Sequence, residues 1–257
     1  MIPPKNANEI ELIRASCRIV AEVQQVLEQV VAPGVSTEQL DALAEETIRK
    51  HGATPAFKGY HGFPASICAS INSETIHGVP GPRRLTSGDV LSIDVGVLRD
   101  GFFGDSAFTL GVGSLEPAYE ILIDATRRCL EAGIAEARTG NQVSDISHAI
   151  EKQAGAAGLK PIQEFGGHGI GRSLHEEPSI LNHGKPGKGP ALRPGLVVAI
   201  EPIMCLGDPE LETASDGWTE VTRSGDYTAH FEHTVAITEV GPEILTAPTR
   251  SVPTLRT

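Results

Sequence analysis

The sequence predicts an α/β fold made of two similar halves. In each half, strands hold the candidate functional residues and helices cover the strands. Three observations predict it: four segments with helical periodicity, one long strand hairpin, and a strand sequence that recurs 107 residues later. Two similar halves bury most apolar surface when their sheets join around a pseudo-twofold axis. We expect one domain over residues 1–257, with halves of about 1–138 and 139–257.

The composition is that of an ordinary globular protein. The 257 residues are 40% hydrophobic and 21% charged, with a formal net charge of −12. This acidic balance argues against a nucleic acid or an anionic membrane as the main partner. The four cysteines form no CxxC pair, which indicates a reducing compartment without disulfides. Because the start has no signal-peptide character and no apolar run approaches ~18 residues, we expect a cytoplasmic protein.

Four segments have the periodicity of amphipathic helices. Ser36 and Gln39 form a capping box at the start of the second segment. A glycine follows each segment within a few residues, as is common at helix C-termini. The part of the chain after the fourth segment is dense in glycine and predicts strands and loops. The four segments are residues 8–31, 36–50, 116–137 and 142–156.

Residues 91–110 predict a β-hairpin. Apolar residues alternate along both arms, and Asp100-Gly101 between them is a strong signal for a two-residue turn. Residues opposed across such a turn have numbers with an odd sum. Asp94 and Asp105 therefore project from the same face, either directly opposed or on a diagonal. Two anions held that close are costly unless one takes a proton or a multivalent cation neutralises both.

A repeat links this hairpin to a second pair of acids. The strand that ends at Asp94 aligns without gaps with a strand that ends at Glu201. The strand that begins at Asp105 matches one that begins at Glu232. The second and fourth helical segments are each bounded by glycines 18 residues apart. If this symmetry holds, four carboxylates converge between the halves, where a pair of divalent cations would justify their burial.

His168 adds an imidazole to this set. It lies in the Gly-Gly-His-Gly run at residues 166–169, where the glycines would let the backbone pass close to a cluster or a substrate. An all-oxygen site suits magnesium or calcium, whereas one imidazole shifts the preference toward manganese, iron or cobalt. A histidine motif also recurs, as His77-Gly-Val-Pro80 and His175-Glu-Glu-Pro178.

The chain resembles the type I methionine aminopeptidases, in their short bacterial form. The resemblance runs from the helix at Glu9-Ile-Glu-Leu-Ile-Arg14 to Ile244-Leu-Thr246, which is nearly the whole chain. It implies the pita-bread fold, with two pseudo-symmetric halves and a central curved antiparallel sheet covered by helices. The residues that carry the resemblance are Asp94, Asp105, His168, Glu201, Glu232, His77 and His175.

The resemblance also implies an activity and a cofactor. The enzymes of this family remove the N-terminal methionine from peptides and nascent proteins with a small second residue. They use a bridging hydroxide between two divalent metal ions; we expect manganese, iron or cobalt here, with zinc or nickel also accepted. By the family's pattern, Asp105 and Glu232 would bridge the ions. Asp94 would complete one shell, and His168 with Glu201 the other.

The same pattern assigns the remaining roles. His175 would hydrogen-bond the scissile carbonyl oxygen, and His77 would contact the nitrogen side of the bond. Glu201 would carry a proton to the leaving amine.

The methionine pocket of the family corresponds here to four residues: Tyr60, Phe63, Cys68 and Trp218. Aromatic and sulfur groups suit a polarizable methionine side chain. Phe63 and Cys68 are equally compatible with plain core packing. Phe63 stands where a tyrosine is frequent, and Leu174 where a phenylalanine often precedes the histidine, so the outline of the pocket departs from the family pattern.

Two alternatives share parts of this pattern. An X-Pro dipeptidase or aminopeptidase P has the same fold and ligands, but usually a separate amino-terminal domain as well. A pita-bread binding module that has lost its metal should lack ligands, whereas all five are present. We expect a monomer that acts on N-terminal methionine peptides and nascent chains, with a transient ribosome contact and no nucleic-acid substrate or membrane.

Overall fold

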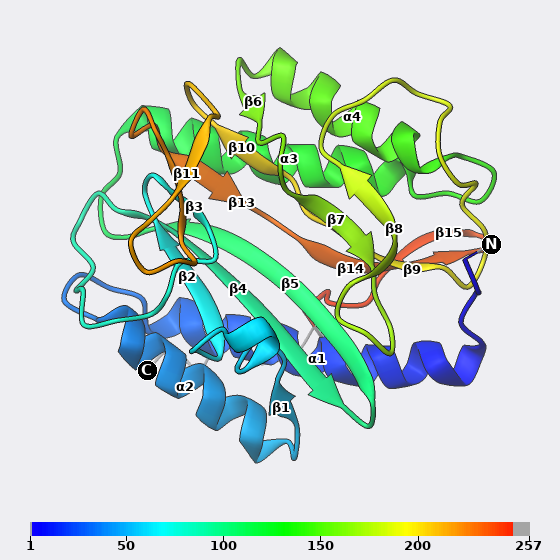
Figure 1. Ribbon diagram of the computed structural model, residues 1–257, viewed down its shortest axis with the longest axis horizontal. Coiled ribbons are helices and arrows are strands. Elements are labelled where there is room, and N and C mark those ends of the chain that lie inside the picture. Colours follow the sequence, from blue (N-terminus) through cyan, green and yellow to red (C-terminus); the bar gives the residue numbers. More distant parts are fainter. Residues whose placement is uncertain (1, 249–257) are drawn as a thin grey trace, which may run out of the picture.

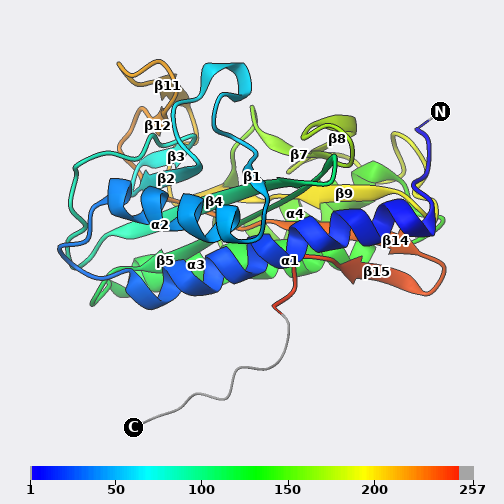
Figure 2. The same cartoon turned by 90° about the horizontal axis from the view of Figure 1, so that it is seen from below.

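Strands form a curved layer through the middle of the molecule, and the long helices lie against one of its faces (Figures 1 and 2). The computed structural model describes residues 2–248. Within this range, no helix is long and apolar enough to cross a membrane.

The four predicted helices are confirmed, with ends within one or two residues of the expected positions. The Gln39 side chain accepts a hydrogen bond from the Ser36 backbone N–H at 2.9 Å, which is one half of the predicted capping box. Asp145 does the same for Gln142 at 2.7 Å, at the start of the fourth helix. The helices are α1 (Ala7–Val30), α2 (Thr37–Lys50), α3 (Pro117–Glu136) and α4 (Val143–Ala156).

The strands alternate with loops between and after the helices. A short 3-10 turn, η1 (Tyr60–Gly62), lies between β1 and β2. Strands up to β5 precede α3, and those from β6 follow α4. The strands are β1 (Thr54–Pro55), β2 (Ile67–Ile71), β3 (Glu74–Ile76), β4 (Val90–Arg99), β5 (Phe102–Gly111), β6 (Lys160–Pro161), β7 (Gly166–Gly169), β8 (Glu176–Leu181), β9 (Val197–Ile200), β10 (Ile203–Cys205), β11 (Leu211–Thr213), β12 (Glu220–Thr222), β13 (Thr228–His230), β14 (His233–Thr238) and β15 (Gly241–Ile244).

The predicted hairpin is the antiparallel pair of β4 and β5. Asp100 and Gly101 form its turn, with φ angles of 50° and 78°. Positive φ at both positions matches the twist of the flanking strands. The register pairs Asp94 with Ala107 and Asp105 with Gly96. The two aspartates therefore share one face on a diagonal, which resolves the choice that the sequence left open.

The two copies of the repeat make the same strand pairings and bridges. β4 pairs with β5, and β9 pairs with β14, both antiparallel. The residue before α2 bridges to Arg84, and the residue before α4 bridges to Ala191, 107 residues further along. β5 and β14 then meet directly: the Glu232 backbone N–H donates to the Ala107 carbonyl at 2.9 Å, and the Thr234 hydroxyl donates to the Asp105 carbonyl at 2.7 Å.

The main apolar core lies between the helices and the strand layer. Val20 and Leu27 of α1, Ile93 of β4, Leu122 of α3 and Ile150 of α4 belong to it and are fully buried. Burying each such side chain contributes about 1.5–3 kcal/mol of stability. This core holds β4 and β9 rigidly, so that the acids at Asp94 and Glu201 point from a fixed support toward the opposite face.

Candidate metal centre and catalytic cavity

One cavity of about 400 Å³ is lined by residues of β2, β4, β5, β7 and β8 and of the loops around them. Strand ends and loops from both halves of the chain form its walls. Each of the 11 site residues expected from the sequence lines it: Tyr60, Phe63, Cys68, His77, Asp94, Asp105, His168, His175, Glu201, Trp218 and Glu232.

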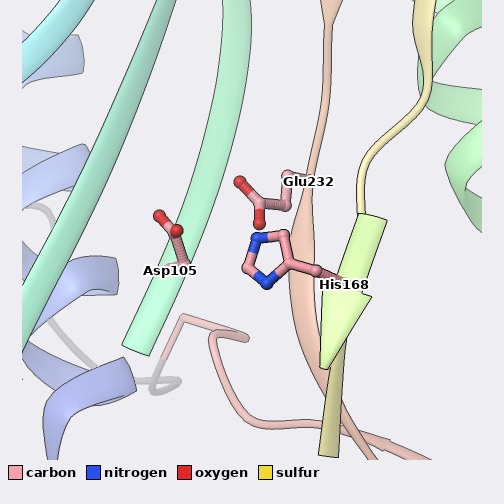
Figure 3. Close-up of side chains that lie close together, drawn as sticks. All are labelled: Asp105, His168 and Glu232. Atoms are coloured by element: carbon pink, nitrogen blue, oxygen red, sulfur yellow. The ribbon is translucent and has the colours of Figure 1, made fainter. Parts of the chain in front are cut away.

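Three potential metal ligands meet at the floor of this cavity. Asp105 projects from β5, His168 from β7, and Glu232 from the connection between β13 and β14. One ligand atom from each lies within 4.8 Å of the others, and all three residues are buried. Figure 3 shows their side chains pointing toward one another from three separate segments of the chain. Residues that are 127 positions apart in the sequence thus form one cluster.

Asp94 and Glu201 flank this cluster on either side. Asp94 stands diagonally beside Asp105 on the hairpin. Glu201 follows the last residue of β9, and its Oε1 lies 3.7 Å from Nε2 of His168. The four carboxylates that the repeat predicted therefore line one cavity together with the imidazole of His168.

The carboxylates lack the partners that buried anions require. Asp94 Oδ1, Asp105 Oδ1 and Glu232 Oε1 are buried without a hydrogen-bond partner. Burial raises the pKa of Asp94 to about 6. Burial and the repulsion among these acids raise the pKa of Asp105 and of Glu232 well above the ordinary carboxyl range. Cations bound among these oxygens would satisfy them and remove the repulsion, so the residues fit a divalent metal site.

His168 is prepared to act as a ligand. Its Nδ1 lies 2.9 Å from the Gly169 carbonyl oxygen, which can only accept, so Nδ1 carries the proton. Nε2 then presents its lone pair toward the acids, as a metal-binding histidine does.

The glycines around His168 let β7 lie close to its two neighbouring strands. A side chain at Gly167 would collide with the Ala199 carbonyl of β9, and one at Gly169 with the Glu177 carbonyl of β8. Gly166 also lines the cavity.

His175 lies beside the metal cluster, at the start of β8. Its ring centroid is 4.3 Å from that of His168, and its Nδ1 is 2.9 Å from the Tyr60 hydroxyl. Burial and the nearby His168 lower the pKa of His175 to about 4, so the imidazole is neutral at neutral pH. The neighbouring residue Glu176 braces this loop, because its carboxylate accepts hydrogen bonds from Arg172 N–H at 2.8 Å and from Lys5 Nζ at 2.7 Å.

His77 follows β3 on the other side of the cavity. Its φ of 59° lies in the left-handed region, which residues other than glycine seldom adopt. Strain of this kind concentrates at functional sites. A side chain at the next residue, Gly78, would clash with the Ala69 carbonyl, so the backbone here is held close to β2. Burial lowers the pKa of His77 as well.

An apolar side pocket adjoins the metal cluster. The rings of Phe63 and Trp218 meet edge to face, with centroids 5.3 Å apart. Cys68 pairs with Asp94 across β2 and β4, and its thiol stays protonated because burial raises its pKa. Asp216 fixes the loop that presents Trp218 by accepting hydrogen bonds from the backbone N–H groups of Trp218 and Thr219 at 2.8 and 2.9 Å.

Several residues of the site were not foreseen as such. Phe165 forms part of the cavity wall and meets His77 edge to face at 5.4 Å. His230 lies 3.4 Å from Oε2 of Glu201. Neither belongs to a recurring motif in the sequence, so nothing in the pattern distinguished them from ordinary core residues.

The metal cluster and its cavity agree with the comparisons with known proteins. Residues 11–239 match metallopeptidase family M24. The chain belongs to this family. Its members depend on divalent metals, as the ligand set among Asp105, His168 and Glu232 suggests.

Relatives within the family cover almost the whole chain. A methionine aminopeptidase of Clostridium perfringens is 48% identical over 246 residues, which are 96% of this chain and 99% of the relative. Methionine aminopeptidase 1 of Mycobacterium tuberculosis is 47% identical over 253 residues, which cover 96% and 95% of the two chains. Both agree with the resemblance stated from the sequence.

Solved structures confirm the pita-bread fold. The crystal structure of a methionine aminopeptidase from Thermotoga maritima superposes with a TM-score of 0.94 at 40% identity, covering 96% of this chain and 99% of the other. A prolidase from Pyrococcus furiosus reaches 0.79 at 23% identity; it covers 96% of this chain, but this chain covers only 66% of the prolidase. That second likeness shows the shared fold alone.

Proposed function

We propose that this chain is a methionyl aminopeptidase, a metalloexopeptidase that removes the N-terminal methionine from peptides and nascent proteins with a small second residue. The observation that carries the proposal is the cluster of Asp105, His168 and Glu232, with unsatisfied carboxylate oxygens, beside an apolar pocket. The names of its relatives, at 46–48% identity, support the same activity.

The metal site would hold two divalent ions, with manganese, iron or cobalt preferred and zinc or nickel accepted. Asp94, Asp105, His168, Glu201 and Glu232 would hold these ions. When bound, such ions polarise a carbonyl group and activate water for attack at neutral pH. The mixed oxygen and nitrogen donors support this choice of metals.

His175 and His77 would hydrogen-bond the two sides of the scissile peptide bond. If the Tyr60 hydroxyl donates to Nδ1 of the neutral His175, Nε2 carries the proton and can donate it to the carbonyl oxygen as negative charge develops there. His77 would hydrogen-bond the nitrogen side of the bond. Glu201 would accept a proton and deliver it to the leaving amine.

The side pocket would select methionine. Tyr60, Phe63, Cys68 and Trp218 offer aromatic faces and a neutral thiol to an unbranched thioether.

We further propose that residues 1–257 act as a single catalytic domain built from the two halves of about 1–138 and 139–257. Met1 and residues 249–257 lie outside the described residues. A monomer in the cytoplasm, with transient ribosome contact and without nucleic-acid substrates or membrane association, fits the acidic charge and the cysteine content.

A peptide panel tests the proposal. Metal-depleted protein is refilled with Mn²⁺, Fe²⁺, Co²⁺, Zn²⁺ or Ni²⁺ and offered Met-Ala-Ser, Leu-Ala-Ser and an X-Pro dipeptide. We expect cleavage of Met-Ala-Ser alone, and its loss in His168→Ala. Cleavage of the X-Pro dipeptide in preference would favour the prolidase-like alternative, and full activity in His168→Ala would refute the ligand assignment.

A further inference from the structure

His230 is a buried histidine at the edge of the metal cluster that the proposed mechanism does not use. Its side chain is 2% exposed. Nε2 is buried without a formed hydrogen bond, and it lies 3.4 Å from Oε2 of Glu201. Leaving a buried polar atom without a hydrogen-bond partner costs about 1–3 kcal/mol. We therefore expect Nε2 of His230 to have a hydrogen-bond partner in the functional protein.

The backbone of His230 is held firmly in place. The Thr109 hydroxyl of β5 accepts a hydrogen bond from the His230 backbone N–H at 2.9 Å and donates to its carbonyl at 2.7 Å. The Ser92 hydroxyl of β4 lies 2.8 Å from the same Thr109 oxygen. β13 also pairs with β10, with His230 opposite Ile203. The imidazole is therefore presented from a rigid strand.

Glu201 is the group to which the His230 imidazole can donate a hydrogen bond. The Asn182 side chain fixes the Glu201 backbone by donating to its carbonyl at 3.0 Å. Oε1 of the carboxylate faces His168 at 3.7 Å, and Oε2 faces His230. Burial alone would raise the pKa of Glu201, but the adjacent imidazoles of His230 and His168 lower it. Carboxylates that bind metal are typically oriented by such partners.

We propose that His230 is a positioning residue for Glu201. Its Nε2–H donates to Oε2 and holds the carboxylate so that Oε1 stays turned toward His168, ready to bind metal. This inference rests on the proposed metal centre. It assigns His230 no contact with the substrate; the residue acts through Glu201.

Three substitutions separate hydrogen-bond donation from plain packing. In His230→Gln, the amide nitrogen reaches about as far as Nε2 and keeps a donor. In His230→Asn, the amide is one carbon shorter and cannot reach Glu201. His230→Met fills a similar volume without a donor. Each protein is stripped of metal and titrated with Mn²⁺ by calorimetry, and its thermal midpoint is recorded in EDTA.

We expect His230→Gln to bind Mn²⁺ within about threefold of the unmodified protein. His230→Asn and His230→Met should bind it about 10–100-fold more weakly. With Met-Ala-Ser and saturating metal, the loss in these two should appear in kcat with KM little changed. If the methionine variant does not fold, the asparagine and glutamine variants still decide the question.

Two results would overturn the inference. Equal Mn²⁺ affinity in all variants would mean that His230 has no influence on Glu201. A glutamine variant as weak as the other two would mean that donation is not the cause. If the unmodified protein binds no metal, the proposed function fails and this inference fails with it; a defect confined to the variants leaves the proposed function intact.

Discussion

Replacing Asp94 with asparagine should stabilise the metal-free protein while weakening its response to metal. Burial raises the pKa of Asp94 from 3.8 to about 6. A shift of this size corresponds to about 3 kcal/mol of unfavourable free energy when the group is ionised at pH 7.5. Asp94 lines the cavity, where water reaches one side, and asparagine needs hydrogen bonds of its own. We therefore expect Asp94→Asn to raise the free energy of unfolding in EDTA by about 1–2 kcal/mol.

With metal bound, Asp94→Asn should lower the stability relative to the unmodified protein instead of raising it. A metal concentration 1,000 times Kd stabilises the unmodified protein by about 4 kcal/mol, and the variant should gain less because one ligand is weakened. Urea denaturation followed by circular dichroism, with EDTA and then with Mn²⁺, measures both quantities. Because the raised pKa of Asp94 destabilises the folded state only above that pKa, Asp94 should add stability to the metal-free parent as the pH falls from 6 to 4. The asparagine variant should gain less over this range.

Asp89 offers a matched control just before the same strand. Its carboxylate accepts hydrogen bonds from the Thr86 backbone N–H at 2.8 Å and the Asn72 amide at 3.0 Å, so it is satisfied without metal. Asp89→Asn should therefore destabilise the protein by about 1 kcal/mol in both conditions. The reasoning would be refuted if Asp94→Asn lowered stability in EDTA, or if Mn²⁺ stabilised the variant and the parent equally.

Three further predictions follow from the site and its supports. His175→Ala should lower kcat for Met-Ala-Ser by about 10²–10³-fold, because a donor to the carbonyl is lost; an unchanged kcat in steady-state assays would contradict this role. Lys5→Met should lower the free energy of unfolding by about 3 kcal/mol, since it leaves the half-buried carboxylate of Glu176 without its cation. The double variant with Glu176→Gln should recover part of that loss, and strictly additive effects in urea denaturation would argue against the coupling. Met1, which lies outside the described residues, should be retained in the purified protein because Ile2 is bulky and β-branched; an intact mass that lacks methionine would count against the proposed specificity.

The sequence predicted the helices and the hairpin well because local physical signals define them. Capping residues mark the start of α2, and the Asp100-Gly101 turn sets the pairing of β4 and β5. Parity placed Asp94 and Asp105 on one face but could not choose between opposed and diagonal positions. That choice depends on a register that only the complete sheet determines.

The carboxylates of the site could be predicted because they repeat, whereas side-chain contacts between segments without a shared motif could not. The recurring strands led from Asp94 and Asp105 to their counterparts directly after β9 and before β14. The Tyr60 contact with His175 and the His230 contact with Glu201 join segments 115 and 29 residues apart that share no motif. The close packing of the glycines around His168 could not be foreseen for a related reason, since their neighbours are backbones of strands that lie elsewhere in the sequence.

The repeat alone would produce a symmetric cation-binding site. The histidines near Glu201 make the environments of the two equivalent acids different. Asp94 and Glu201 occupy equivalent positions in the aligned strands, yet burial raises the pKa of Asp94, while His230 and His168 lower that of Glu201. Both imidazoles lie within 4 Å of Glu201. The pKa of one equivalent acid is thereby lowered in the metal-free protein, and that of the other is raised. An ionised carboxylate between two imidazoles is available to accept a proton, so the proton-transfer role proposed for Glu201 depends on this asymmetry.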